Sequence, residues 1–324
     1  MCTALTLHTS DHYFGRNLDL EFSYRETVTI TPRNYPLAFR NVPPFENHHA
    51  LIGMAYVQKD YPLYYDATNE FGLSMAGLNF PGNAHYAPVS DEKNNVSPFE
   101  LIPWLLGQCK SLSEVQPLLD NLNVCSVPFS QDLPLSPLHW IISDQEKSIT
   151  LEAMADGLHI HENTPGILTN NPPFDYHMLN LANYMALSSL QPENSLSSLT
   201  PLNHYSRGMG GLGLPGDLSS PSRFVRAAFM KANSLCGGSE AESVGQFFHI
   251  LDSVAHIRGS VQVTPGNYEI SVYSSCCNMD RGIYYYKTYE NSQISAVHMH
   301  HENLEGRTLI SYPLISSQQI NHQN

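Results

Sequence analysis

The chain has unusually few charged residues. Of its 324 residues, 14% are Asp, Glu, Lys or Arg, whereas soluble domains usually carry roughly 25%. Bases are the scarcer kind: 16 Lys and Arg stand against 30 acids, which gives a net charge of −14. This balance repels a polyanion and no basic cluster offsets it, so we expect no binding of DNA or RNA.

Long apolar runs are also missing. No stretch approaches the roughly 18 apolar residues of a membrane span, and the N-terminus lacks the basic and apolar segments of a secretory signal. We therefore expect a cytoplasmic protein with no membrane partner. Hydrophobic residues still make up 42% of the chain, which suffices for a substantial core and excludes a fibrous or wholly disordered protein.

The common signatures of metal and cofactor sites are absent. The six cysteines form no CxxC pair, as a structural zinc site of the usual spacing would require. HExxH is missing, and so is G-x-S-x-G, which disfavours a serine hydrolase of the α/β type. The G-x-G-x-x-G match at 208–213 follows no predicted strand and is followed by Pro215-Gly216 instead of a helix, so it does not predict a dinucleotide site.

Two clusters near the C-terminus have plain structural interpretations. His298, His300 and Glu302 would share one face if a strand from Ile294 continued through them, and imidazoles with a carboxylate suit zinc. Histidines near a polar chain end are commonly solvated, so we favour a surface or subunit-contact role. The adjacent cysteines at 276–277 are interpreted as packing residues, because free cysteines are usually buried.

Hydrophobic patterning places strands in blocks at both ends of the chain and most helices between them. Strands are predicted around Leu5–Leu7, from Gly15, and at 51–58, 73–78, 139–143, 149–154, 158–162, 268–275, 283–289 and 294–299. Helices are predicted at 98–109, 113–122, 176–188, 222–232 and 240–254. This grouping favours an α+β fold of antiparallel sheets with helices stacked on them.

No shift in composition marks a domain boundary, so residues 1–324 are predicted to form a single domain. Residues 190–222 lack periodicity and are rich in Ser, Pro and Gly. An irregular stretch of this length is usually functional or disordered. Five of its leucines argue that something covers them, which suggests an assembly arm: Leu196, Leu199, Leu202, Leu212 and Leu214. The alternative is a mobile surface loop.

The second residue is the sharpest candidate for chemistry. If Met1 is removed, Cys2 carries both a thiol and an α-amine, and the pKa of such an amine is roughly 8. A nucleophile and its base would then occupy one residue. Arg16 and Asp19 follow one short hairpin later, close enough to lower the thiol pKa and to hold the amine.

Several blocks, in order, resemble the choloylglycine hydrolase family, which comprises bile salt hydrolases and penicillin V acylases. They span about two-thirds of the chain from its first residue and read Met1-Cys2-Thr3, Gly15-Arg16-Asn17-Leu18-Asp19, Gly77-Leu78-Asn79-Phe80-Pro81-Gly82, Leu168-Thr169-Asn170-Asn171-Pro172, Tyr205 to Asp217, and Ser222-Arg223-Phe224-Val225-Arg226. The resemblance implies a four-layer αββα sandwich of the N-terminal-nucleophile hydrolase type, active as a homotetramer and without metal or organic cofactor.

Carried over by position, the resemblance implies six catalytic residues: Cys2, Arg16, Asp19, Asn79, Asn170 and Arg223. Cys2 would be the nucleophile, and the two asparagines would support the oxyanion and the reacting amide. Other interpretations remain open. Asn79 precedes a Pro-Gly turn, where Asn often serves the turn itself; Asn171 competes with Asn170; and an arginine on a helix is usually solvated.

Apolar and aromatic residues in predicted loops form the candidate substrate wall. They are Leu20, Phe22, Tyr24, Tyr61, Tyr65, Phe129, Leu133 and Leu138, and a steroid body suits such a wall. The alternative is that they are ordinary core residues. Asn79 resembles the bile salt hydrolases, since penicillin V acylases more often place Tyr there.

The sequence therefore predicts a bile salt hydrolase, an N-terminal cysteine amidohydrolase that cleaves glycine- or taurine-conjugated bile salts. The close alternative is a penicillin V acylase or another N-acyl amide hydrolase. From a different class comes a non-catalytic amphiphile-binding protein that would use the aromatic residues but not the thiol.

Overall fold

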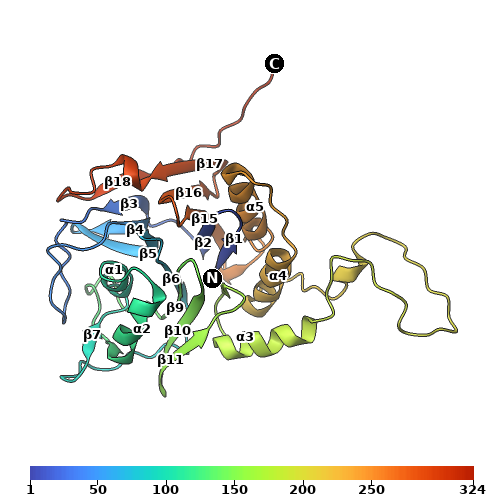
Figure 1. Ribbon diagram of the computed structural model, residues 1–324, viewed down its shortest axis with the longest axis horizontal. Helices are drawn as coiled ribbons and strands as arrows, with labels where there is room; N and C mark the ends of the chain where they lie inside the picture. The colour runs from blue at the N-terminus through green and yellow to red at the C-terminus, as the bar shows by residue number, and fades with distance from the viewer.

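The computed structural model describes residues 1–324, and its centre is a pair of stacked β-sheets (Figure 1). The first sheet has six strands in the order β12-β1-β2-β15-β16-β17, and every neighbouring pair is antiparallel. Its strands are β1 (Cys2–His8), β2 (His12–Leu20), β12 (Ile167–Leu168), β15 (Ile270–Asn278), β16 (Ile283–Thr288) and β17 (Asn291–His298). The N-terminal strand is thus an inner strand of this sheet.

The second sheet has eight strands in the order β11-β10-β9-β6-β5-β4-β3-β18, also antiparallel throughout. Its strands are β3 (Thr27–Thr31), β4 (Leu51–Gln58), β5 (Tyr61–Asn69), β6 (Ser74–Asn79), β9 (Leu138–Ser143), β10 (Ser148–Met154), β11 (Gly157–Glu162) and β18 (Ile310–Pro313). Two small pairs lie outside both sheets: β7 (Asn94–Val96) with β8 (Leu122–Val124), and β13 (Gln262–Thr264) with β14 (Asn267–Tyr268).

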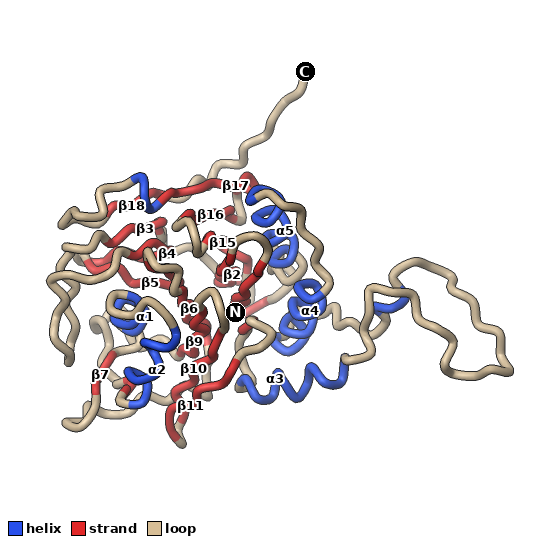
Figure 2. Tube along the Cα trace, in the orientation of Figure 1, coloured by secondary structure: helices blue, strands red, loops and turns tan.

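Helices cover the outer faces of the two sheets (Figure 2). Helices α1 (Leu101–Leu106) and α2 (Leu112–Asp120) lie on the second sheet, whereas α4 (Ser220–Ala232) and α5 (Glu240–Asp252) cover the first and α3 (Phe174–Leu181) packs against α4. The result is a four-layer αββα sandwich, as the sequence predicted. No helix is both long enough and apolar enough to cross a membrane.

Alternation along the strands of the second sheet builds two separate cores. On β9, Ile141 belongs to the core shared with the first sheet, α4 and α5, whereas its neighbours Trp140 and Ile142 belong to the core beneath α1 and α2. Successive side chains of a strand point to opposite faces, so a strand buried on both faces must be apolar at nearly every position. The run Trp140-Ile141-Ile142 meets that condition.

The predicted elements agree closely with those in the structure, with two kinds of correction. β4 has the predicted bounds. All five predicted helices are present, although α2, α3 and α4 begin one or two residues earlier than predicted and all but α4 end earlier. The aromatic residues at 61–65, interpreted as part of a loop, belong to β5 (Tyr61–Asn69), and β3 and β18 were not predicted at all. Polar and proline residues in these strands broke the apolar pattern, and only pairing with β4 and with each other gives them their place.

The segment at 190–222 is irregular, as predicted, but its last residues are helical because α4 begins at Ser220. Its single regular turn is the short 3-10 helix Met209–Gly211, so no strand or long helix surrounds the glycine-rich stretch. The segment extends away from the body (Figure 1). Four of its leucines, at 190, 196, 199 and 212, are 63–92% exposed.

Candidate active site

Cys2 lies at the start of β1, between two strands that bring distant residues beside it. β2 pairs with β1 on one side, with Cys2 opposite Leu18, and β12 pairs with it on the other, with Ala4 opposite Leu168. The residues after β12 therefore reach the nucleophile at the end of the hairpin. Cys2 itself is 3% exposed.

Asn170 and Arg223 converge on Cys2. The side-chain oxygen Oδ1 of Asn170 accepts hydrogen bonds from the backbone N–H of Cys2 at 2.8 Å and from Arg223 Nη2 at 2.7 Å. Arg223 Nη1 donates to the Cys2 carbonyl at 2.5 Å and to Thr3 Oγ1 at 2.6 Å. Arg223 is thus a fully buried cation that binds the strand of the nucleophile, and it is not solvated as an arginine on a helix usually is.

The first turn of α4 explains why this arginine points inward. Arg223 and Phe224 are both fully buried, and Arg223 Nε donates to the carbonyl of Leu218 at 3.0 Å. One turn later Arg226 contacts the end of the irregular segment instead, through the carbonyls of Pro215 and Asp217. Burial lowers the pKa of the Arg223 guanidinium, so its charge depends on the acceptors around it.

Arg16 and Asp19 on β2 are also fully buried. Arg16 Nη1 donates to the carbonyls of Tyr65 at 3.0 Å and Gly77 at 2.5 Å, while Nη2 has no partner in the chain. Burial alone would lower the pKa of Arg16, but the acidic groups near it, Cys2 foremost, raise it. A buried arginine with a free N–H group beside a thiol is suited to stabilise a thiolate.

The carboxylate of Asp19 is held by two groups. Its Oδ1 accepts the hydroxyl of Ser271 at 2.5 Å, and its Oδ2 lies 3.1 Å from His256 Nδ1. Burial alone would raise the pKa of Asp19, but His256 and the charge of Arg223 outweigh burial and lower it. Asp19 is therefore an ionised carboxylate in the interior.

Asn79 ends β6 and joins the cluster through its backbone. Its carbonyl accepts a hydrogen bond from Asn170 Nδ2 at 2.7 Å, so both polar atoms of the Asn170 side chain are occupied. The side-chain amide of Asn79 makes no hydrogen bond in the chain. The Asn79 amide therefore keeps both of its N–H groups for a substrate, whereas Asn170 Nδ2 has already used one of its two.

Met1 precedes Cys2 and covers it. Its amino group donates to the carbonyl of Asp19 at 2.7 Å and forms an ion pair with Glu269. Burial lowers the pKa of this ammonium group. While Met1 is attached, the nitrogen of Cys2 is an amide that cannot accept a proton, so Met1 must leave before that nitrogen can act as a base.

The residues predicted to line the substrate site fall into three groups. Leu20, Tyr65 and Leu138 adjoin the catalytic cluster, since Leu20 follows Asp19, the Tyr65 carbonyl binds Arg16, and Leu138 pairs with Asn79. Tyr61 and Phe129 pack together with ring centroids 5.8 Å apart, and Leu133 lies in a turn that bonds Ser130. The ring centroids of Phe22 and Tyr24 lie 5.0 Å apart, and these two residues are 57% and 43% exposed.

One sequence interpretation changes and one holds. Four residues predicted to lie in loops are strand residues of β2, β5 and β9: Leu20, Tyr61, Tyr65 and Leu138. β17 ends at His298, so the alternation that would align His298, His300 and Glu302 stops there, and nowhere in the chain do three His, Cys, Asp or Glu residues gather as metal ligands. The cysteines at 276–277 are buried, as predicted.

Sequence reasoning missed the residues that hold the cluster together. Thr3 receives a bond from Arg223, Ser220 donates to Thr169 and accepts from Asn170 N–H, and Ser271 binds Asp19. Ser220 and Ser271 belong to no recognisable motif, and each contact spans from 50 to 252 residues along the sequence. Only Thr3, inside the N-terminal block, lay within reach of the motif argument.

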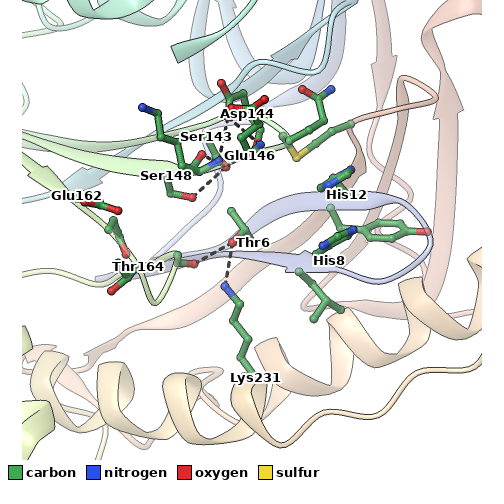
Figure 3. Close-up of a pocket in the computed structure, with 17 residues that line it drawn as sticks. Thr6, His8, His12, Ser143, Asp144, Glu146, Ser148, Glu162, Thr164 and Lys231 are labelled. Carbon is green, nitrogen blue, oxygen red and sulfur yellow. Dashed lines mark hydrogen bonds between the residues drawn. The ribbon is translucent and has the colours of Figure 1, made fainter. Parts of the chain in front are cut away.

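A polar cavity of about 340 Å³ opens at the turn end of the β1–β2 hairpin, away from Cys2 (Figure 3). Its lining includes Thr6, His8, His12, Asp144 and Lys231, and none of the six predicted catalytic residues. Lys231 Nζ donates to Thr6 Oγ1 at 2.9 Å and to the Pro165 carbonyl at 2.6 Å. With no carboxylate partner, burial lowers the pKa of Lys231 to about 8.

The αββα sandwich and the buried polar cluster around Cys2 define a hydrolase of the N-terminal-nucleophile type. The model of the linear amide C–N hydrolases, choloylglycine hydrolase family, matches residues 2–312. The chain belongs to this family, and its activity is that of a hydrolase acting on linear amide C–N bonds.

Named relatives and solved structures agree. A bile salt hydrolase/transferase from Lactiplantibacillus plantarum is 57% identical over 98% of both chains, and one from Clostridium perfringens is 40% identical over the full length of both. The crystal structure of a conjugated bile acid hydrolase from Clostridium perfringens superposes with a TM-score of 0.92 at 38% identity, covering both chains entirely. Penicillin V acylase from Agrobacterium tumefaciens shares the fold, with a TM-score of 0.76 at 16% identity over 96% of this chain and 90% of that one.

Proposed function

We propose that the protein is a bile salt hydrolase that cleaves glycine- or taurine-conjugated bile acids to the free bile acid and the amino acid. One observation carries the proposal: Asn170 and Arg223 converge on Cys2 in a chain 57% identical to a named bile salt hydrolase/transferase. The apolar residues Leu20, Tyr65 and Leu138 adjoin that cluster, where a steroid body would need them.

The proposed reaction begins with removal of Met1, which frees the α-amine of Cys2. The Cys2 thiolate attacks the amide carbonyl, and the free amide of Asn79 donates to the oxyanion. The C–N bond breaks as the α-amine passes the thiol's proton to the departing amine, leaving a cholyl thioester on Cys2. Water then attacks the thioester carbonyl while the α-amine of Cys2 accepts a proton from that water. The C–S bond breaks, the free bile acid departs, and the proton returns to the Cys2 thiol.

The other residues orient this chemistry. Asn170 Oδ1, which accepts from the Cys2 nitrogen at 2.8 Å, keeps that nitrogen in place when it becomes an amine. Arg223 holds Asn170 and the Cys2 carbonyl together. Arg16, whose Nη2 is free, and Asp19 supply the opposite charges that a thiolate and an ammonium group need.

The test is hydrolysis of glycocholate, taurocholate and penicillin V by the purified protein, with the Cys2→Ala variant as the blank. We expect both bile salts to be cleaved far faster than penicillin V. Preference for penicillin V would favour the acylase alternative. No turnover of any amide, together with an intact mass that retains Met1, would favour the non-catalytic amphiphile-binding protein.

We further propose that residues 1–324 act as one cytoplasmic domain and that residues 190–222 are the assembly arm of a homotetramer. In the single chain the arm extends away from the body, and five of its leucines are exposed: Leu190, Leu196, Leu199, Leu202 and Leu212. Ordering such a segment costs roughly 1–2 kcal/mol per residue of backbone, which contacts with another copy can offset. Light scattering tests the state: deletion of 195–200 should lower the mass and the activity together, and a fully active monomer would refute the arm.

A further inference from the structure

A buried histidine outside the predicted catalytic set faces the active-site carboxylate. His256 lies in the connection between α5 and β13, and its side chain is fully buried. Nδ1 is 3.1 Å from Asp19 Oδ2, off the ideal hydrogen-bond direction, and neither ring nitrogen has any other partner. Burying an imidazole without partners costs free energy, so the contact with Asp19 is the one polar interaction that compensates this side chain.

The backbone of His256 also reaches Asp19, through Ser271. The N–H of His256 donates to Ser271 Oγ at 2.8 Å, and the Ser271 hydroxyl donates to Asp19 Oδ1 at 2.5 Å. Ser271 N–H in turn donates to the His256 carbonyl at 3.1 Å. The contacts form a closed ring in which each oxygen of Asp19 faces one member of the pair His256 and Ser271.

The ring acts where the nucleophile's amine will form. The backbone of Asp19 brackets the residue before Cys2, because its N–H donates to the Met1 carbonyl at 2.9 Å and its carbonyl accepts from the Met1 amino group. Burial lowers the pKa of the Met1 amino group, and the charge of Asp19 opposes that lowering. We expect the Asp19 carboxylate to favour the charged form of the Cys2 amine in the same way. Rotation of the carboxylate would change the direction and strength of that attraction.

We propose that His256 is a positioning residue for the hydrolysis reaction: with Ser271 it fixes both oxygens of Asp19 and keeps this carboxylate ionised beside the amine of Cys2. The inference rests on the proposed function, because it assigns the amine a role in turnover. His256 is a positioning residue and not a catalytic one, since it acts through Asp19.

The expected pH effect follows from the charges around Asp19. Those that face it are His256, Arg223 of α4, Arg16 of β2 and the amino terminus. Without the imidazole, burial would act on the carboxyl with less opposition, and its pKa would rise. The acid limb of activity would then move to higher pH, because Asp19 would lose its charge sooner as pH falls.

The test compares His256→Leu with His256→Asn on glycocholate, after mass analysis has confirmed removal of Met1. Leu removes the Nδ1 contact, whereas the Asn amide offers an N–H group near the same place. We expect Leu to lower kcat about tenfold, the order of effect of losing one polar contact with a charged group, with KM little changed and the acid limb at higher pH. Asn should restore most of kcat and the original limb.

The matched control is His48→Leu. His48 is also buried, but its ring bonds the carbonyls of His49 and Tyr35, and it contacts no active-site residue. We expect kcat to stay unchanged there while stability falls. Should His256→Leu fail to fold, Ser271→Ala replaces it as the test of the same ring, with the same expected effects.

Two outcomes would overturn the inference: parental kcat and acid limb in His256→Leu, or equal loss in the Leu and Asn variants, which marks a purely structural role. Failure of the proposed function looks different. In that case the parent protein itself does not hydrolyse conjugated bile salts, while it still folds and loses Met1.

Discussion

The two ends of the β1–β2 hairpin carry polar groups of opposite character. Beside Cys2, the side chains of Arg16, Asp19 and Arg223 are all fully buried; Arg223 binds the Cys2 carbonyl, and Asp19 lies against His256. At the turn end, the cavity near Thr6 mixes buried polar groups such as Asp144 with exposed ones such as His8. The half-buried Lys231 there meets only neutral acceptors.

This difference separates an active site from a polar surface recess. Buried charges cost free energy unless they are paired, so a cluster of three around one thiol is retained for a purpose. Groups at an open recess keep their water, and their presence needs no function. The cavity near Thr6 is well formed, yet the chemistry lies where Met1 covers Cys2.

The largest expected effect is at the nucleophile itself. Cys2→Ala should abolish bile salt hydrolysis because no other group can form the thioester, and Cys2→Ser should retain little, since an alcohol is a far weaker nucleophile near neutral pH. Initial rates on glycocholate measure this. Cys236→Ala, at a half-buried thiol remote from the cluster, serves as control. Full activity in Cys2→Ala would refute the mechanism.

The next effect separates two arginines one turn apart on α4. Arg223→Met removes the donors to Cys2, Thr3 and Asn170 and leaves buried acceptors unpaired, so we expect kcat/KM to fall at least about 100-fold and the unfolding free energy to drop by about 3 kcal/mol. Arg226→Met, which loses only bonds near Pro215, should stay active. Equal losses in both variants would mean that Arg223 has no special link to Cys2.

A smaller effect should appear in thiol labelling. Burial raises the pKa of the other five cysteines, to about 12 for Cys109 and Cys277, so little of their thiolate exists near neutral pH. In the protein lacking Met1, iodoacetamide should modify Cys2 first and abolish activity in step. Peptide mapping measures the order. Cys236 is the most accessible competitor. If it were labelled before Cys2 while activity fell in step, that order would contradict this interpretation.

The smallest effect concerns Lys231 and stability. Burial lowers its pKa to about 8, so between pH 8 and roughly 10.4 the unfolded chain holds a proton that the folded chain has lost. Its contribution to stability therefore rises with pH across that window, by at most about 3 kcal/mol. Urea unfolding at pH 7.5 and 10.5 should show a larger rise for the parent than for Lys231→Met. An equal rise in the parent and in Lys231→Met would mean that the Lys231 ammonium group is solvated in the folded protein.

The sequence by itself determined much of the architecture. Strands such as β4 were predictable because apolar residues fill nearly every position, and the blocks around Cys2, Asn170 and Arg223 were predictable from resemblance to a family. The aromatic segment at 61–65 has the sequence pattern of a loop, because Pro62 and the polar residues near it interrupt the apolar alternation of a strand. Pairing with β4 overrides that local signal.

Tertiary structure alone decided how the site works. Asn79 and Asn170 are equivalent in the sequence, yet only the fold shows that both polar atoms of the Asn170 side chain make hydrogen bonds, whereas the Asn79 amide makes none. His256 and Ser271 belong to no motif, and they reach Asp19 because β15 pairs with β2 across some 250 residues of chain. Sequence patterns report local backbone preference and burial, whereas the direction of a buried charge depends on every element packed around it.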